Sequence, residues 1–166
     1  MTRGHLLIRA DGDARIGAGH LIRCLSLARG WVSSGGAATL ATATPAEHIR
    51  RRATRTGVHL ELLPAAHPDP SDLAAFADLA VRLRPVWTIL DGYHLDSSYQ
   101  LAVRKLETRV MVIDDLAHMS EYHADAILNQ NINAENLEYS VPGHSVGVPR
   151  SGDIVDQDSL LFTDLR

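Results

Sequence analysis

The feature that most constrains this chain is a glycine-rich stretch, residues 9–23, placed between an apolar run and a helical pattern. The run at residues 6–8 is wholly apolar and predicts a buried strand. Beyond the glycines, apolar residues such as Leu21 and Leu25 recur at helical spacing. The stretch therefore predicts a strand, a tight turn and a helix. His20 falls in the first turn of that helix, where free backbone N–H groups can hold an anion.

This stretch differs from two common phosphate-binding fingerprints. Ile22 stands where the dinucleotide fingerprint needs another glycine after Gly17 and Gly19. No Gly-Lys-Ser/Thr follows, so the stretch is not a P-loop either, and neither a dehydrogenase nor a kinase is favoured. On the local pattern alone, a packing turn that contains a histidine stays an alternative interpretation.

The rest of the chain alternates apolar runs with helical patterns. Ser71 is the expected N-cap of a helix that Pro85 ends, and Asp96 or Ser97 caps the next helix. This alternation predicts an α/β fold: a Rossmann-like parallel sheet with helices on both faces. Beyond the first strand, strands are expected at residues 37–44, 58–63, 86–90, 110–113 and 126–128.

Composition narrows the class of protein. A chain of 166 residues suffices for one domain with a core. The net charge of -4 argues against a nucleic-acid partner. Cys24 is the single cysteine, which excludes an internal disulfide and fits a reducing compartment. With no signal peptide and no apolar run of membrane-spanning length, we expect a cytoplasmic protein without a membrane partner.

Polar residues follow the predicted strands one after another. Because the carboxyl ends of parallel strands share one edge of a sheet, we expect these side chains to meet there, together with His20. Carboxylates, amides and a phenol suit a polar small-molecule ligand. The residues are Asp11, Asp91 with Tyr93, Asp114 with Asp115, and Asn129 with Asn131.

A metal-dependent hydrolase is a further alternative. It would use His94, His118 and His123 together with Asp91 or Asp114. The spacing of these residues matches no familiar ligand motif, and the main hypothesis includes neither a metal nor a cofactor.

Four ordered blocks within residues 3–142 resemble the nucleotide-sugar hydrolases of pseudaminic acid biosynthesis and related spore-coat polysaccharide proteins. The first block comprises Arg9, Asp11, Gly12, Ile16, Gly17, Gly19, His20, Arg23, Cys24, Leu25, Leu27 and Ala28, and the others are residues 91–96, 112–117 and 125–131, with 133–139 continuing the match.

The resemblance implies the N-terminal half of a glycosyltransferase-B fold and hydrolysis of UDP-2,4-diacetamido-2,4,6-trideoxy-β-L-altropyranose to UDP and the free sugar. His20 matches the family's proposed catalytic base, and Tyr93 matches an active-site tyrosine. The expected substrate-binding residues are Arg9, Asp11, Gly17, Gly19, Arg23, Asp91, Asp115, Asn129 and Asn131.

A histidine suits this chemistry, because UDP is already a good leaving group and the reaction lacks only an activated water. A base that works near neutral pH is what an imidazole supplies, and the helix dipole at His20 favours the neutral ring. Either Asp11 or Asp115 is expected to orient its other nitrogen. One base opposite the leaving group predicts inversion at the anomeric carbon.

The end of the chain departs from the family. Residues 143–166 do not align with it and are expected to form a divergent, poorly ordered tail, with 1–142 as the domain. We expect the nucleotide-binding C-terminal domain to be absent, so activity is expected only if a separate chain supplies that half. The alternative is a non-catalytic truncated remnant or a sugar-binding module of the same fold.

Overall fold

The computed structural model of the chain describes residues 3–12, 18–43, 45–132 and 134–142. Gly17 and the predicted tail at 143–166 therefore lie outside the described residues. The elements are β1 (His5–Ala10), α1 (Gly19–Ser33), β2 (Ala37–Thr42), α2 (Glu47–Thr56), β3 (His59–Leu62), α3 (Pro70–Leu83), β4 (Trp87–Asp91), α4 (Ser97–Arg104), β5 (Arg109–Ile113), β6 (Ala126–Leu128) and the short 3-10 helix η1 (Ala134–Asn136).

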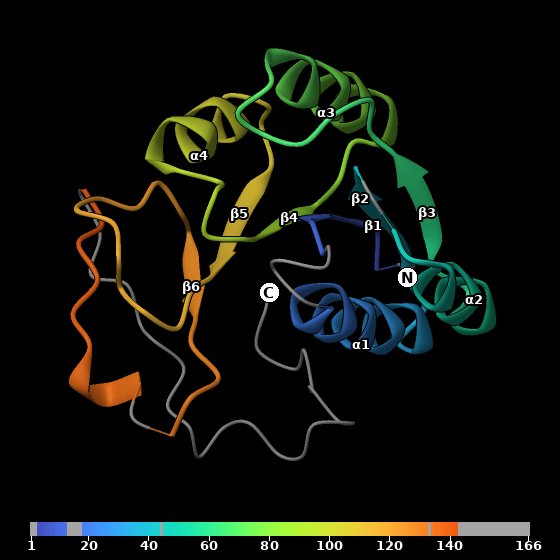
Figure 1. Cartoon of the computed structure of the whole chain (residues 1–166), viewed down its shortest axis with the longest axis horizontal. Helices are drawn as coiled ribbons and strands as arrows, with labels where there is room; N and C mark the ends of the chain where they lie inside the picture. The colour runs from blue at the N-terminus through green and yellow to red at the C-terminus, as the bar shows by residue number, and fades with distance from the viewer. Residues whose placement is uncertain (1–2, 13–17, 44, 133, 143–166) are drawn as a thin grey trace.

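The strands form one parallel sheet in the order β3-β2-β1-β4-β5-β6. In its centre, Ile8 of β1 pairs with Leu40 of β2 on one side and with Ile89 of β4 on the other. Helices α1 and α2 cover one face, while α3 and α4 cover the other (Figure 1). This arrangement confirms the predicted Rossmann-like α/β fold. Strand order reverses between β1 and β4, the place where open parallel sheets bind ligands.

Each face of the sheet has its own apolar core. Leu6 and Ile8 point into the core shared with α1 and α2, whereas Leu7 between them points into the core shared with α3 and α4. All three side chains are buried. A strand buried on both faces needs apolar residues at every position, which is why this run shows no alternation of apolar and polar residues.

The N-terminal cap of α4 is as predicted from the sequence, whereas the cap of α3 differs from the prediction. Asp96 caps α4 as predicted, because its side chain accepts a hydrogen bond from the Tyr99 backbone N–H. The predicted cap of α3 at Ser71 is wrong: Asp69 is the N-cap, and its carboxylate accepts the Ser71 N–H. Pro70 then occupies the first helical position, where its missing N–H costs no hydrogen bond.

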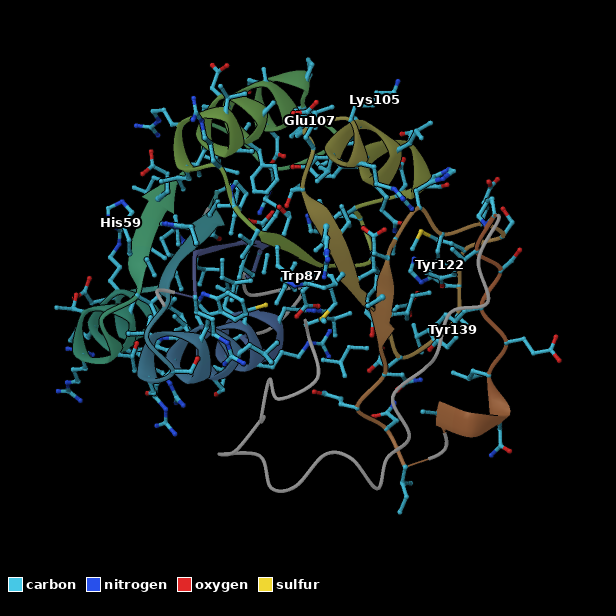
Figure 2. The ribbon with its side chains drawn as sticks, turned by 180° about the vertical axis from the view of Figure 1, so that it is seen from behind. His59, Trp87, Lys105, Glu107, Tyr122 and Tyr139 are labelled. Carbon is cyan, nitrogen blue, oxygen red and sulfur yellow. The ribbon has the colours of Figure 1, made fainter. Side chains whose placement is uncertain are left out.

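The segment after β6 returns along the edge of the sheet. Figure 2 shows Tyr122 and Tyr139 beside β6, and their ring centroids are 5.4 Å apart. The Tyr139 hydroxyl donates to the Asp114 carbonyl over 2.8 Å and accepts from the Asn129 side-chain amide over 2.8 Å. These bonds fix the polar loops that follow β5 and β6 against each other.

Candidate active site

His20 lies in the first turn of α1 and contacts a carboxylate at the end of β4. Its Nδ1 is 2.6 Å from Oδ1 of Asp91, a residue with no exposed surface. Arg23, one turn further along α1, donates from Nε and Nη2 to the two oxygens of the same carboxylate over 2.6 and 2.5 Å. Asp91 thus joins α1 to β4 at the switch point of the sheet.

Two contacts of His20 Nδ1 place opposite demands on the proton of the ring. Both the Asp91 carboxylate and Nη2 of Arg23 lie within 2.9 Å of Nδ1. A carboxylate can only accept and a guanidinium can only donate. The shorter contact is with the carboxylate, so we assign the proton to Nδ1, which leaves the Nε2 lone pair available. The predicted orienting groups, Asp11 and Asp115, are wrong, because Asp91 fills that role.

Asp91 is ionised despite its burial. Loss of solvent opposes the charge, but the hydrogen bonds from Arg23 and His20 outweigh it and lower the pKa of the carboxyl group. Cys24 also donates from Sγ to Asp91 Oδ2 over 3.2 Å. Burial, reinforced by the charge of Asp91, raises the pKa of the Cys24 thiol well above its usual value. Cys24 is therefore a structural residue of the site and not a nucleophile.

Tyr93 stands beside His20 at the carboxyl edge of the sheet. The two rings meet edge to face with centroids 5.3 Å apart, and Tyr93 makes a similar contact with His118 at 5.4 Å. Its hydroxyl donates to Oδ1 of Asp115. Partial burial and the negative charge of Asp115 raise the pKa of Tyr93 to about 12. Tyr93 is therefore protonated at neutral pH and acts as a donor.

A second carboxylate, Asp11 at the end of β1, belongs to a buried ion network. Arg9 donates from Nη2 to Asp11 over 2.5 Å and also binds Asp72 of α3 through Nε and Nη2. The Tyr99 hydroxyl donates to Asp72 over 2.7 Å. Arg9 has no exposed surface, which corrects the prediction that it contacts the substrate. In this conformation its guanidinium positions Asp11.

His94 is held at the same edge by Asp11. Its Nε2 lies 3.1 Å from Asp11 Oδ2. Burial opposes ionisation of Asp11, but hydrogen bonds from His94 and Arg9 lower the pKa of its carboxyl group well below the usual range. A Cβ atom on Gly92 would come within 2.7 Å of the His94 ring. Glycine at this position therefore lets His94 fold back toward β1.

A third imidazole is paired with a carboxylate at the end of β5. His118 Nδ1 is 2.9 Å from Asp114 Oδ2, and Asp114 is almost completely buried. The same carboxylate accepts hydrogen bonds from the Tyr122 hydroxyl and the Leu116 N–H. Three successive strands of the central sheet, β1, β4 and β5, therefore each end in a buried aspartate that holds one histidine.

Four of the predicted binding residues remain to be placed: Gly19, Asp115, Asn129 and Asn131. Gly19 opens α1, and a Cβ atom there would meet nothing within 4 Å. Asp115 accepts from Tyr93 and lies 4.0 Å from Arg23. Asn129 is buried and accepts the Asn131 N–H over 2.9 Å, while Asn131 itself is exposed.

Two members of the buried ion network around Arg9, Asp72 and Tyr99, were not expected from the sequence. Asp72 follows an expected helix cap and looks like an ordinary first-turn acid, yet it lies buried beneath Arg9. Tyr99 looks like an apolar position of α4. The available signal was Arg9 itself, because an arginine inside a buried strand requires a buried acid.

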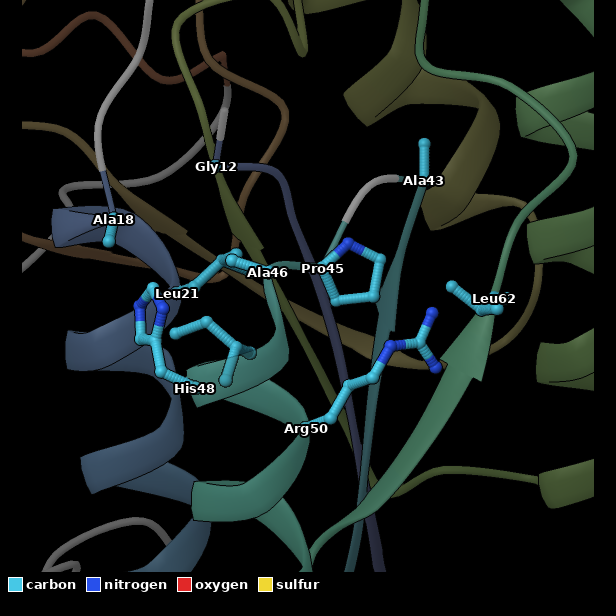
Figure 3. A pocket seen from close by; sticks show the side chains of 10 residues that line it. Gly12, Ala18, Leu21, Ala43, Pro45, Ala46, His48, Arg50 and Leu62 are labelled. Atoms are coloured by element: carbon cyan, nitrogen blue, oxygen red, sulfur yellow. The ribbon is translucent and has the colours of Figure 1, made fainter. Parts of the chain in front are cut away.

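A cavity of about 530 Å³ lies next to the N-terminal turn of α1 (Figure 3). Leu21, Pro45 and Ile49 are among the residues that form its apolar wall, and His48 and Arg50 reach it from α2. The cavity does not include His20 or Tyr93. We place the candidate active site at the histidine–aspartate pairs, because the histidine, aspartate and tyrosine side chains that can do chemistry lie together there.

The metal-dependent hydrolase alternative can be compared with this geometry. Within the described ranges, no group of three or more histidine, cysteine, aspartate or glutamate side chains is arranged to hold a metal ion. The histidines of the metal hypothesis are each paired with a different acid: His94 with Asp11, His118 with Asp114, and His123 with Glu121. In the same part of the chain, no helix has the length and apolar character to span a membrane.

Comparison with known proteins shows the fold. No protein-family model matches this chain, and no curated protein matches it. The crystal structure of MurG from Acinetobacter baumannii superposes with a TM-score of 0.55 at 15% identity, over 83% of this chain and 44% of MurG. The glycotransferase of kitacinnamycin gives a TM-score of 0.41 at 23% identity, over 66% of this chain and 30% of the other.

The match to MurG, taken with the observed strand order, identifies the class of fold. The chain has the architecture of the N-terminal half of a glycosyltransferase-B fold. It spans less than half the length of MurG. The identity is too low for the match to carry activity or substrate from one protein to the other.

Proposed function

We propose that this chain is the sugar-side half of a nucleotide-sugar hydrolase that releases UDP from a UDP-diacetamido-trideoxyhexose. The observation that carries the proposal is the His20–Asp91 pair at the switch point of the sheet, 2.6 Å between Nδ1 and Oδ1. This pairing leaves Nε2 of His20 as a proton acceptor. The sequence resemblance to pseudaminic acid pathway hydrolases supplies the substrate class.

The proposed step is a single displacement. A water molecule attacks the anomeric carbon of the sugar while Nε2 of His20 takes one of its protons. The bond between the anomeric carbon and the β-phosphate oxygen breaks, and its electron pair leaves with UDP. The imidazolium formed on His20 is stabilised by Asp91, whose negative charge already faces Nδ1. Attack opposite the leaving group inverts the anomeric centre.

Tyr93 and Arg23 complete the sugar side of the proposed site. Tyr93 packs its ring against His20, and it is the more exposed of the two residues. Its protonated hydroxyl is a donor suited to hydroxyl or amide oxygens of a sugar. Arg23 fixes Asp91 through two hydrogen bonds, so its role in this scheme is to position the carboxylate that orients His20.

The nucleotide side of the site requires a second half. Glycosyltransferase-B folds bind ligands between two domains, and the present chain spans 44% of the length of MurG. We propose that a second, nucleotide-binding half completes the cleft. Binding energy from the nucleotide would then help to place the anomeric carbon near His20.

The test is release of UDP from UDP-diacetamido-trideoxyhexose by this chain, alone and mixed with the nucleotide-binding half of a related hydrolase. Release on mixing is expected, with a loss of about a hundredfold or more in the His20→Asn variant and preserved binding. His59→Asn, on the exposed edge strand β3, is the matched control (Figure 2). Turnover at the unmodified rate by His20→Asn would contradict the role of His20.

A non-catalytic sugar-binding module is the second candidate. The same assay separates the two candidates, because a module would bind the nucleotide sugar and release no UDP even when the second half is supplied.

A further inference from the structure

The cavity beside the N-terminal turn of α1 is separate from the histidine–aspartate pairs, none of which is among the described residues that line it. Its volume of about 530 Å³ falls within the roughly 300–1,000 Å³ of pockets that hold small molecules. Leu21 and Ile49 of its wall are fully buried, whereas Leu62 of β3, which also lines it, is 50% exposed. A ligand in the cavity would therefore cover apolar surface that is open to solvent.

Two polar side chains, His48 and Arg50, reach this cavity from α2. Figure 3 shows Arg50 extending toward Leu62. Among the described residues, the Arg50 side chain has no ion-pair or hydrogen-bond partner, whereas Arg82 is paired with Glu61. An unpaired guanidinium offers a planar fork of N–H donors, which binds a phosphate group at two points.

The charge of α2 adds to the attraction for an anion. Of its ten residues, four are exposed arginines and one is an acid, Glu47, which is not among the residues given above as lining the cavity. The N-cap of the helix, Ala46, does line the cavity, and its methyl group cannot accept hydrogen bonds from the first-turn N–H groups. Asp69 and Asp96 supply such a cap in α3 and α4. The N-terminal end of α2 is therefore electropositive where it meets the cavity.

We propose that this cavity binds a small organic phosphate, whose apolar group packs against Ile49 and Leu62 while its phosphate binds Arg50. An apolar wall alone would suit a neutral ligand, and arginines alone would attract any polyanion. Their position on one cavity of small-molecule size selects a soluble ligand that carries both groups. The inference is independent of the proposed function, because neither His20 nor UDP enters it.

The first test uses hexyl phosphate, which joins an apolar chain to a phosphate, titrated into the full chain by calorimetry at neutral pH. We expect saturable binding at one site, and binding at least about tenfold weaker for hexanol and for inorganic phosphate, since each lacks one of the two groups. Backbone ¹H–¹⁵N spectra should show the largest shifts at Leu21, Ala46 and Ile49. Shifts confined to other residues, or equal affinity for hexanol, would overturn the inference.

The second test changes the two parts of the site separately. Arg50→Met removes the charge and keeps an unbranched side chain, and we expect hexyl phosphate to bind about tenfold more weakly or worse. The matched control is Arg51→Met, the same change at an exposed position of α2 that is not among the described lining residues. Ala46→Leu adds volume at an exposed position that lines the cavity, and it should weaken hexyl phosphate binding while the urea midpoint stays unchanged.

Three results of these titrations would contradict the site. They are no binding of hexyl phosphate by the unmodified chain, equal binding by Arg50→Met and Arg51→Met, and unchanged binding by Ala46→Leu. Sedimentation with phosphatidylcholine vesicles that contain phosphatidate distinguishes a lipid from a soluble ligand. Association with these vesicles without binding of hexyl phosphate would assign the arginines to a membrane surface and overturn the inference. None of these readouts requires turnover, so they are independent of whether the chain hydrolyses a nucleotide sugar.

Discussion

Replacing Arg9 with methionine tests the buried ion network most severely. Arg9 has no exposed surface and donates to both Asp11 and Asp72. Methionine fills a similar volume but leaves the buried carboxylates of Asp11 and Asp72 without their guanidinium partner. Removing one partner of a buried ion pair costs about 3–5 kcal/mol, a large part of the roughly 5–15 kcal/mol that stabilises a domain.

The assay is urea unfolding followed by far-ultraviolet circular dichroism. Arg51→Met, on the exposed side of α2, is the matched control and is expected to change the free energy of unfolding by less than about 0.5 kcal/mol. Asp72→Asn combined with Arg9→Met is expected to cost less than the sum of the single changes, since the double variant leaves fewer buried charges. A loss below about 1 kcal/mol for Arg9→Met would refute the network as described.

Three further predictions concern the neighbouring groups. The pKa values of Asp11 and Asp91 are lowered on folding, so their contribution to stability is present above about pH 4 and lost as pH falls through the folded-state values; Asp91→Asn should flatten the pH dependence of unfolding below pH 4. Iodoacetamide should label Cys24 in urea and not in the folded chain, and rapid labelling of folded protein would contradict its burial. Gly92→Ala should displace His94 from Asp11, and an unchanged His94 imidazole signal in NMR spectra would show that the close approach is absent.

Much of the fold could be predicted because burial dictates composition directly. Strands covered on both faces must be apolar throughout, and the runs around Leu7 and Ile89 carry that requirement in their own residues. The alternation of such runs with helical patterns then restricts the topology to a parallel sheet. Asp96 was predictable as a cap for a different reason: a cap bonds to a backbone N–H only three positions away, so its signal is local in the sequence.

The pairing of the site residues could not be predicted in the same way. Sequence placed Asp11, Asp91 and Asp114 at one edge, but the choice of histidine for each depends on the twist of the sheet and on the entry of each loop. His20 and Asp91 are 71 residues apart, and His94 and Asp11 are 83 apart. Local spacing holds no information on such contacts, so Asp91 was expected to bind substrate and was not expected to orient His20.

Arg9 shows that a motif alone does not distinguish a residue that contacts a ligand from a buried residue that positions its neighbours. Its place in a stretch that resembles a hydrolase family suggested contact with a ligand, but its position in the central strand buries it completely. The family resemblance located an important residue, and the structure assigned it a positioning role through Asp11.

The proton on His20 provides the most direct test of the central claim. A long-range ¹H–¹⁵N spectrum of the folded chain at neutral pH, with Asp91→Asn to assign the signal, reports which ring nitrogen is protonated. The geometry predicts a proton on Nδ1, bound to Asp91, and a bare Nε2 ready to accept one from water. A proton found on Nε2 in the free chain would contradict the assignment of His20 as the base.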